Sequence, residues 1–257
     1  MPTVESQGAT LYYEVHGDGP PLVFAHGAGG NTLSWFQQVP HFARSRRVVT
    51  FDHRGFGRSS CPIDAIRPRY FAEDLRAILD ANGIERAALV CQSMGGWGGL
   101  RFALSWPERA SCLVLCDTPG GVLTEKTLAG LATTPATLME RGIAAVNLAP
   151  DFPKRNPSMA HLYVEISGLN PALETLPLAG ALVQERVDLD ELRSFTVPTL
   201  VISGERDALF SPDSLREVAA LIPGANAYVI PEAGHSSYFE SPETFNRVVE
   251  DFISSHH

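Results

Sequence analysis

The stretch Ala87-Ala-Leu-Val-Cys-Gln-Ser-Met-Gly-Gly96 contains an apolar run that is followed directly by a polar turn. Residues 87–91 are apolar at consecutive positions, which is typical of a parallel strand buried on both faces of a sheet. A helical pattern of apolar residues follows over 94–105. The stretch therefore predicts a strand, a sharp turn around Ser93 and a helix, which is how α/β folds are built.

The same alternation of strand and helix patterns extends along most of the chain. Residues 10–16 alternate in polarity and end at Gly17-Asp-Gly-Pro-Pro21, which predicts an antiparallel first strand and a turn. Further strands are predicted at 22–25, 48–51, 87–91, 112–116, 199–203 and 227–230, and helices at 32–43, 70–81, 94–105, 212–221 and 242–253. We therefore expect a mostly parallel central sheet with helices on both faces.

One interval has no strand pattern. From about residue 121 to residue 195 the chain shows apolar helical stretches interrupted by prolines at 135, 150, 153, 157, 171 and 177. We expect an α/β core of residues 1–120 and 196–257, with 121–195 inserted as a helical lid, or cap, that packs on the sheet. Residues 166–183 contain a single charged residue, Glu174, so the lid is expected to present an apolar surface.

The composition is that of a mildly acidic globular chain. The 257 residues include 29 Asp and Glu against 20 Lys and Arg, which gives a formal charge of -9, and 44% of them are hydrophobic. This composition argues against a disordered chain. The excess negative charge argues against nucleic acid as a partner, because phosphate backbones are bound by Lys and Arg. We expect a small-molecule substrate, and the oligomeric state stays open.

The sequence offers no support for membrane attachment or for a bound cofactor. The first eight residues lack the basic flank and apolar run of a signal peptide, and no window approaches about 18 apolar residues, so we expect a soluble, cytoplasmic protein. The cysteines, at 61, 91, 112 and 116, form no CxxC pair, and the eight histidines form no HxH or HExxH motif. We therefore expect no metal, no other cofactor and no disulfide.

Three residues with complementary chemistry follow separate strands. Ligands of open α/β sheets bind at the carboxyl ends of the strands, and Ser93, Asp207 and His235 each come within a few residues of the end of an apolar run. A serine hydroxyl needs a base within hydrogen-bond reach and a carboxylate that orients the base. We therefore predict Ser93 as nucleophile, His235 as base and Asp207 as acid.

Backbone amides near Ser93 are predicted to stabilise negative charge on a substrate. The Met94 N–H lies at the start of a helix, where the dipole favours negative charge. The loop His26-Gly-Ala-Gly-Gly30 follows another strand, and its small residues allow the Ala28 N–H to point inward. Ala28 and Met94 form the predicted oxyanion hole, and the predicted substrate-binding residues are Gly27, Gly29 and Trp97.

Taken in order, these motifs resemble the α/β-hydrolase family over nearly the whole chain. HGAGG at 26–30, DHRGFGRS at 52–59, SGERD at 203–207 and PEAGH at 231–235 each match a family element in its expected place. The order of nucleophile, acid and base is also that of the family. The resemblance implies an enzyme that works through an acyl-enzyme, with the lid inserted after the sixth core strand, and it extends to small esterases and 3-oxoadipate enol-lactonases.

Three points stay open in the sequence, and one further motif receives a structural interpretation. Cys91 replaces the first glycine of the family's Gly-x-Ser-x-Gly turn, which leaves the geometry of the turn uncertain, although Cys91 itself is expected to be inert packing. Asp117, directly after the strand at 112–116, is an alternative to Asp207 as the acid. Trp97 either packs in the core or lines the pocket. The segment from Asp52 to Arg58 lacks the Gly-Lys-Ser/Thr of a P-loop, and we interpret it as a tight turn held by Asp52 and Arg54.

The function predicted from these residues is hydrolysis of a small, largely apolar carboxylic ester or lactone. An apolar lid over an apolar pocket favours such a substrate over a polyanion and excludes water from the reacting carbonyl. A carbon-carbon bond hydrolase, a cofactor-free haloperoxidase and a lyase would use the same three residues. A ligand receptor with slow residual hydrolysis is the alternative from another functional class.

Overall fold

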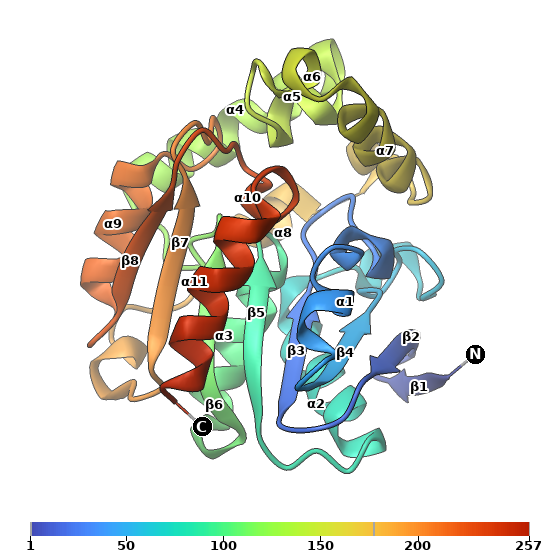
Figure 1. Cartoon of the computed structure of the whole chain (residues 1–257), viewed down its shortest axis with the longest axis vertical. Coiled ribbons are helices and arrows are strands. Elements are labelled where there is room, and N and C mark those ends of the chain that lie inside the picture. Colours follow the sequence, from blue (N-terminus) through green and yellow to red (C-terminus); the bar gives the residue numbers. More distant parts are fainter. Residues whose placement is uncertain (1, 177, 257) are drawn as a thin grey trace.

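The computed structural model describes residues 2–176 and 178–256, and an eight-stranded sheet runs through its centre (Figure 1). The strands are β1 (Thr3–Ser6), β2 (Ala9–His16), β3 (Pro21–Ala25), β4 (Arg47–Phe51), β5 (Ala87–Gln92), β6 (Ala110–Cys116), β7 (Thr199–Gly204) and β8 (Asn226–Ile230). Their order in the sheet is β1-β2-β4-β3-β5-β6-β7-β8. The pairs β1–β2 and β2–β4 are antiparallel and the other neighbours are parallel, so the prediction of a mostly parallel sheet is confirmed.

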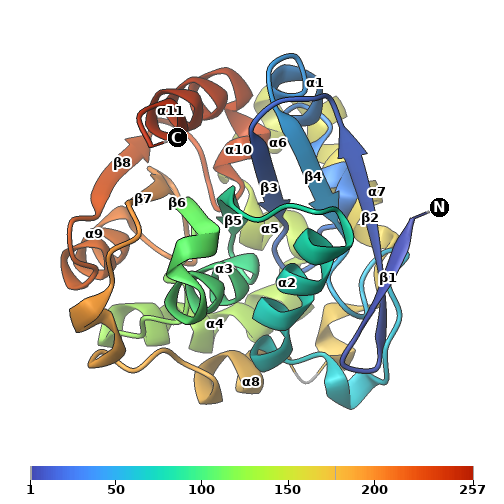
Figure 2. The same ribbon diagram turned by 90° about the horizontal axis from the view of Figure 1, so that it is seen from below.

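Helices cover both faces of the sheet (Figure 2). One face carries α1 (Val39–Phe42) and α11 (Pro242–Ser254), and the other carries α2 (Phe71–Ala81), α3 (Gly95–Ser105) and α9 (Pro212–Leu221). Neighbouring residues of a strand point to opposite faces. In β5, Leu89 packs with the side chains of α2 and α3, whereas Val90 packs with those of α1 and α11. The unbroken apolar run of β5 therefore follows from its burial on both sides.

The segment between β6 and β7 contains helices and 3-10 turns but no strand within the described residues. These elements are α4 (Glu125–Arg141), α5 (Ile143–Asn147), α6 (Phe152–Arg155), α7 (Pro157–Gly168), η5 (Leu173–Thr175), α8 (Leu178–Gln184) and η6 (Glu191–Ser194). Helices α4 to α7 lie above the carboxyl ends of the strands (Figure 1). Within the predicted apolar lid segment, Pro177 and the side chain of Glu174 lie outside the described part of the structure.

The remaining elements are short and connect the larger ones. They are η1 (Thr32–Trp35), η2 (Ile63–Ala65), η3 (Pro68–Tyr70), η4 (Pro107–Arg109) and α10 (Ser237–Glu240). The single helix predicted at 32–43 is wrong, because Pro40 cannot donate an N–H to a continuing helix and instead lies in the first turn of α1. Strand β1 was not predicted, since it is only four residues long and its one apolar residue, Val4, gives no recognisable pattern. The other predicted strand and helix boundaries agree with the structure within two residues.

The cysteines, the possible metal ligands and the apolar helices can each be located in the structure. All four cysteines are free thiols, and those at 91, 112 and 116 are buried. In the described part of the chain, no group of three or more His, Cys, Asp or Glu side chains is arranged to hold a metal ion. None of the helices described here is both long and apolar enough to cross a lipid bilayer.

The loop after β4 is held by two different carboxylates. Asp52 accepts the Thr32 N–H at 2.6 Å and the Arg58 N–H at 2.8 Å. Arg54 donates from Nε and Nη2 to the carboxylate of Asp74 in α2, at 2.7 and 2.6 Å, and both of these side chains are fully buried. Asp52 and Arg54 therefore both hold this turn, as predicted, although Arg54 does so by attaching the loop to α2.

Replacing Arg54 by methionine would leave the buried Asp74 carboxylate without its cation. We expect the free energy of unfolding to fall by about 3–5 kcal/mol, the usual cost of removing one partner from a buried ion pair. Urea denaturation measures this change, with Arg86→Met as a control because Arg86 is exposed. Equal unfolding midpoints for the two variants would show that the ion pair does not stabilise the fold.

Candidate active site

Ser93 lies in a strained turn between β5 and α3. Its φ of +47° is in the left-handed region that residues other than glycine rarely adopt. The Ser93 N–H donates to the Cys116 carbonyl at 3.0 Å. The Ser93 carbonyl accepts the Gly96 N–H at 2.9 Å and the Thr118 hydroxyl at 2.6 Å. These three hydrogen bonds offset the backbone strain, which is typical of residues that a fold holds in place for function.

Small residues allow α3 to begin close to the neighbouring strand β3. A Cβ on Gly95 would lie 2.6 Å from the Ala25 carbonyl oxygen and 2.8 Å from the His26 carbonyl oxygen, so a larger residue would displace the backbone. The Cys91 sulfur packs against Gly99, where an added Cβ would overlap it. The turn therefore closes with cysteine at position 91 because Gly99 leaves room for it. Burial also raises the pKa of the Cys91 thiol to about 12, so this thiol stays neutral.

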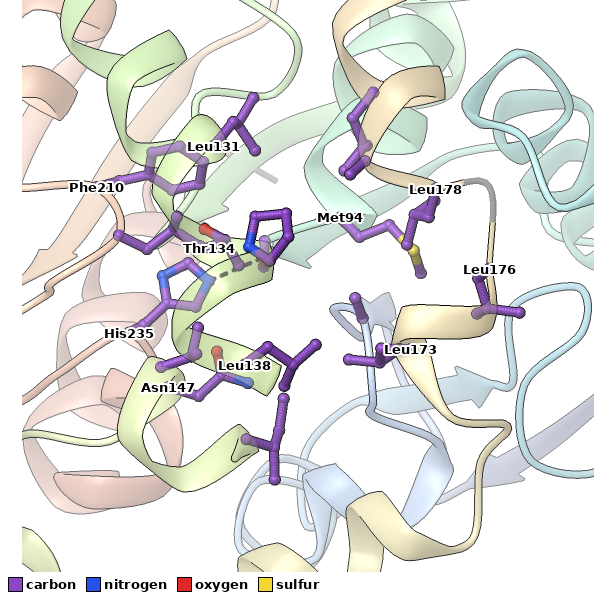
Figure 3. A pocket seen from close by; sticks show the side chains of 18 of the residues that line it. Met94, Leu131, Thr134, Leu138, Asn147, Leu173, Leu176, Leu178, Phe210 and His235 are labelled. Carbon is purple, nitrogen blue, oxygen red and sulfur yellow. Dashed lines mark hydrogen bonds between the residues drawn. The ribbon is translucent and has the colours of Figure 1, made fainter. Parts of the chain in front are cut away.

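Ser93, His235 and Asp207 come together at the carboxyl ends of β5, β8 and β7. Ser93 Oγ donates to His235 Nε2 at 2.8 Å, the dashed line in Figure 3, and His235 Nδ1 donates to Asp207 Oδ2 at 2.9 Å. The other oxygen of Asp207 accepts the N–H groups of Leu209 and Phe210 at 2.8 and 2.9 Å. The carboxylate is thus fixed in place, and it holds the imidazole with Nε2 turned toward the hydroxyl.

The surroundings of His235 favour its protonated form. Burial lowers the pKa of the imidazole, but the Asp207 carboxylate, which is both a charge and a hydrogen-bond acceptor, raises it. The result is a pKa above the ordinary histidine value of 6.5. A raised pKa means that a proton taken from Ser93 would be held by the imidazole more strongly than by a free histidine.

Asp117, the alternative acid, lies beneath this site and does not bind the imidazole through a hydrogen bond in the described structure. One of its oxygens accepts the Gly204 N–H at 2.8 Å, and the other accepts the N–H and hydroxyl of Ser237 at 3.0 and 2.7 Å. Burial raises the pKa of Asp117 to about 7, and the Asp207 charge adds to this shift. Asp117 therefore joins the chain segments that carry Asp207 and His235.

The loop after β3 forms a tight turn over residues 27–30. The Gly30 N–H donates to the Gly27 carbonyl at 3.0 Å, and Gly29 has a φ of +79°, the value that a type II turn requires at its third residue. A Cβ on Gly27 would lie 2.8 Å from the Ser93 Cβ, so the loop can pass this close to Ser93 only with glycine there. In the described part of the chain, neither the Ala28 N–H nor the Met94 N–H donates to a backbone carbonyl, and both remain available to a ligand.

A pair of buried histidines supports this loop from behind. Burial lowers the pKa of His26, which favours its neutral form. His26 Nδ1 donates to the Gly27 carbonyl at 2.7 Å, and His26 Nε2 accepts the backbone N–H of His53 at 2.9 Å. The Gly27 carbonyl thus accepts two hydrogen bonds, which fixes the peptide whose N–H belongs to Ala28. The sequence pattern alone does not reveal this role of His26 and His53, because the two residues lie on separate loops that only the fold brings together.

An apolar cavity of about 230 Å³ opens above Ser93 and His235 (Figure 3). Its polar side chains are those of Ser93, Thr134, Asn147 and His235, and none of the described residues that line it is Asp, Glu, Lys or Arg. Most of the lining comes from the insertion: Leu131, Thr134, Pro135, Leu138, Met139, Ile143, Val146, Asn147, Leu173, Leu176, Leu178, Ala179 and Leu182. The lid therefore forms much of the candidate binding site.

The predicted site residues differ in where they lie relative to this cavity. Ala28, Met94 and Trp97 line it, and the Trp97 Nε1 also donates to the Leu182 carbonyl at 3.0 Å, so Trp97 both packs in the core and lines the pocket. Gly27 and Gly29 do not line the cavity but shape the turn beside it. The lining residues of α4 and α5 were missed, because the sequence pattern of the lid does not show which of its apolar faces meets the sheet.

The chain resembles known proteins in both sequence and structure. A family model described as "alpha/beta hydrolase fold" matches residues 20–172 and 170–242. The "Putative carbamate hydrolase RutD" of Caulobacter sp. (strain K31) is 30% identical over 95% of this chain and 96% of its own. The "3-oxoadipate enol-lactonase 2" of Acinetobacter baylyi is 28% identical over 96% of this chain and 94% of its own. The solved structure titled "Est816 as an N-Acyl homoserine lactone degrading enzyme" has a TM-score of 0.81 at 26% identity, and covers 98% of this chain and 100% of that one.

The close contact at Gly95 is testable by adding a single methyl group. We expect Gly95→Ala to lower the free energy of unfolding by about 1–3 kcal/mol, because the backbone at 25 and 26 must move to admit it. Gly180→Ala in α8 is the matched control, since nothing lies within 4 Å of a Cβ there, and it should be neutral or slightly stabilising. Thermal or urea unfolding compares them, and equal stability of both variants would contradict the contact.

Proposed function

This chain belongs to the α/β-hydrolase fold family of enzymes, and on that premise we propose that it hydrolyses an uncharged, largely apolar carboxylic ester or lactone. The observation that carries the proposal is the Ser93 hydroxyl, 2.8 Å from His235 Nε2, at the base of an apolar cavity. Asp207 is the proposed acid, because its carboxylate accepts the Nδ1 proton of His235. The N–H groups of Ala28 and Met94 form the proposed oxyanion hole.

In the proposed reaction, His235 Nε2 takes the proton of Ser93 as Oγ attacks the substrate carbonyl. The imidazolium that results is stabilised by Asp207, and the Ala28 and Met94 amides stabilise the oxyanion. His235 then protonates the leaving alkoxide, which leaves an acyl group on Ser93. A water molecule that gives its proton to His235 attacks this acyl group, and the proton returns to Ser93 as the acid product leaves.

The cavity argues for the substrate class. Its volume of about 230 Å³ is below the roughly 300–1,000 Å³ typical of pockets for drug-sized ligands, so the substrate is small. No Lys or Arg among its described lining residues could pair with a carboxylate, and burying an unpaired charge there would be costly. The relatives' names include a carbamate hydrolase, an enol-lactonase and a lactone-degrading enzyme, which is consistent with attack on a carbonyl that carries a leaving group. Among such carbonyl substrates, the uncharged ones fit this cavity best.

The test is hydrolysis of neutral short-chain p-nitrophenyl esters and of neutral lactones by the wild-type chain and by Ser93→Ala. We expect turnover by the wild type and a loss of about 10,000-fold or more in the variant, because no covalent route remains. A fluorophosphonate should add its mass to the wild-type chain and not to Ser93→Ala. Ser194→Ala, at an exposed serine, should behave as the wild type.

Outcomes of the same assay separate this proposal from the alternatives. An ester that carries a terminal carboxylate should be a much poorer substrate than its methyl-capped counterpart, and an equal rate would contradict the neutral substrate class. Ser93→Ala with full activity would refute the nucleophile. Tight binding of a neutral ester with almost no turnover would instead favour the receptor alternative.

The pH dependence of kcat/KM should follow the protonation of His235. Attack by Ser93 needs the neutral imidazole, so kcat/KM should rise with pH and level off above the pKa of His235, which lies above 6.5. Asp207→Asn removes the charge that raises this pKa, so the midpoint should move to lower pH while the plateau falls by about 10,000-fold. Asp213→Asn is the control, since that carboxylate is exposed. An unchanged midpoint in Asp207→Asn would contradict the proposed role of Asp207.

A further inference from the structure

One side chain of the lid contacts two loops of the core at once. Asn170 follows α7, and its Nδ2 donates to the Gly29 carbonyl at 2.8 Å while its Oδ1 accepts the Gly57 N–H at 2.9 Å. Because one partner is a carbonyl and the other an N–H, the partners determine the orientation of this amide. Nδ2 also donates to the carbonyls of its own helix end, at 3.2 Å to Ser167 and 3.4 Å to Ile166. Asn170 is therefore held by its own helix end while it bridges the loops after β3 and β4.

A second contact joins the same turn of the lid to the same loop. Asn31, which is buried, donates from Nδ2 to the Ile166 carbonyl at 3.0 Å. The Asn31 Oδ1 accepts the Leu33 N–H at 3.0 Å, so this side chain is also fixed by contacts at both ends. Two independent hydrogen bonds therefore join the end of α7 to residues 29–31. Asn170 of the lid donates one of them, and Asn31 of the loop donates the other.

These contacts continue into the turn that carries the proposed oxyanion amide. The Gly29 carbonyl, which accepts from Asn170, belongs to the same peptide as the Gly30 N–H, and that N–H donates to the Gly27 carbonyl at 3.0 Å. The Gly27 carbonyl in turn belongs to the same peptide as the Ala28 N–H. Asn170 is therefore connected to the Ala28 N–H through two peptide groups in a hydrogen-bonded chain. Such chains polarise and orient their members, so a change at one end reaches the other.

From this connection we propose that Asn170 is a positioning residue by which the lid holds the oxyanion loop in its working geometry. The inference rests on the proposed function, because it assigns a role to the Ala28 N–H in that reaction. Asn170 touches no substrate: it is absent from the residues that line the cavity, and it acts through Gly29. Leu173 follows it closely in the chain and does line the cavity, so the same docked segment forms part of the pocket and supports the oxyanion loop.

Asn170→Asp is the sharpest test, because it keeps the shape of the side chain and its acceptor for the Gly57 N–H but places an oxygen against the Gly29 carbonyl. We expect kcat to fall by about 10-fold, less than the roughly 100- to 1,000-fold typical when an oxyanion donor itself is removed, while KM stays nearly constant. The affinity of an alkyl boronate, which forms a tetrahedral adduct on serine, should fall in parallel with kcat. The rate of fluorophosphonate labelling should fall with it.

Two further variants separate positioning from loss of structure. Asn170→Ala removes both contacts without introducing repulsion, and we expect a smaller loss of kcat and of boronate affinity than for Asn170→Asp. Asn156→Ala changes an exposed asparagine at the other end of α7 that makes no side-chain cap, and it should match the wild type. Melting temperatures should agree among all these proteins, since Asn170 lies near the surface of the lid and is partly exposed.

The outcomes for the two proposals are distinct. Wild-type boronate affinity and labelling rate in a folded Asn170→Asp protein would overturn the inference and leave the proposed function standing. A fall in kcat with unchanged boronate affinity would also overturn it, because the loss would then lie elsewhere than in the oxyanion loop. A wild-type chain that neither turns over esters nor reacts with the fluorophosphonate at Ser93 would overturn the proposed function itself.

Discussion

The close approach of α3 to the end of β3 is the constraint on which the rest of the site depends. Because Gly95 has no side chain, the first turn of α3 begins within contact distance of the Ala25 and His26 carbonyls. That approach forces Ser93 into a left-handed conformation and places the start of the helix beside the loop that follows β3. A hydroxyl, a helix N-terminus and a turn with an available N–H therefore meet at one point, although they come from two separate strands.

Buried polar side chains hold the segments around this site in fixed positions relative to one another. Asp117, which follows β6, joins the end of β7 to the segment after β8, and His26 joins the loops after β3 and β4, so the ends of five strands are held by these two side chains. Each of these side chains is nearly inaccessible to water, and its hydrogen bonds offset the cost of burying it. The burial that makes this scaffold rigid also raises the pKa of Asp117 to about 7. The same physical environment thus determines both the stability and the electrostatics of the site.

The insertion supplies most of the cavity lining, whereas the core supplies Ser93 and His235. Leucines and other apolar side chains of α4, α5 and the segment after η5 face Ser93 and His235 across the cavity. A site divided in this way can keep its chemistry while the lid changes, which is consistent with the different activities named among the relatives. Through Asn170 the lid also contacts the loop beside Ser93, so its contacts extend beyond the lining of the pocket.

The sequence by itself determined the α/β class, the strands of the parallel sheet and the candidate residues Ser93, Asp207 and His235, because strand burial and turn chemistry are local properties of the chain. It did not determine that Arg54 would pair with Asp74, that Asp207 and not Asp117 would bind the imidazole, or which face of the lid would line the cavity. Only the tertiary structure decided these points, because each depends on the distance between segments far apart in the chain. Local patterns specify which residues are buried, but a partner for a buried charge is chosen by the packing of the whole fold.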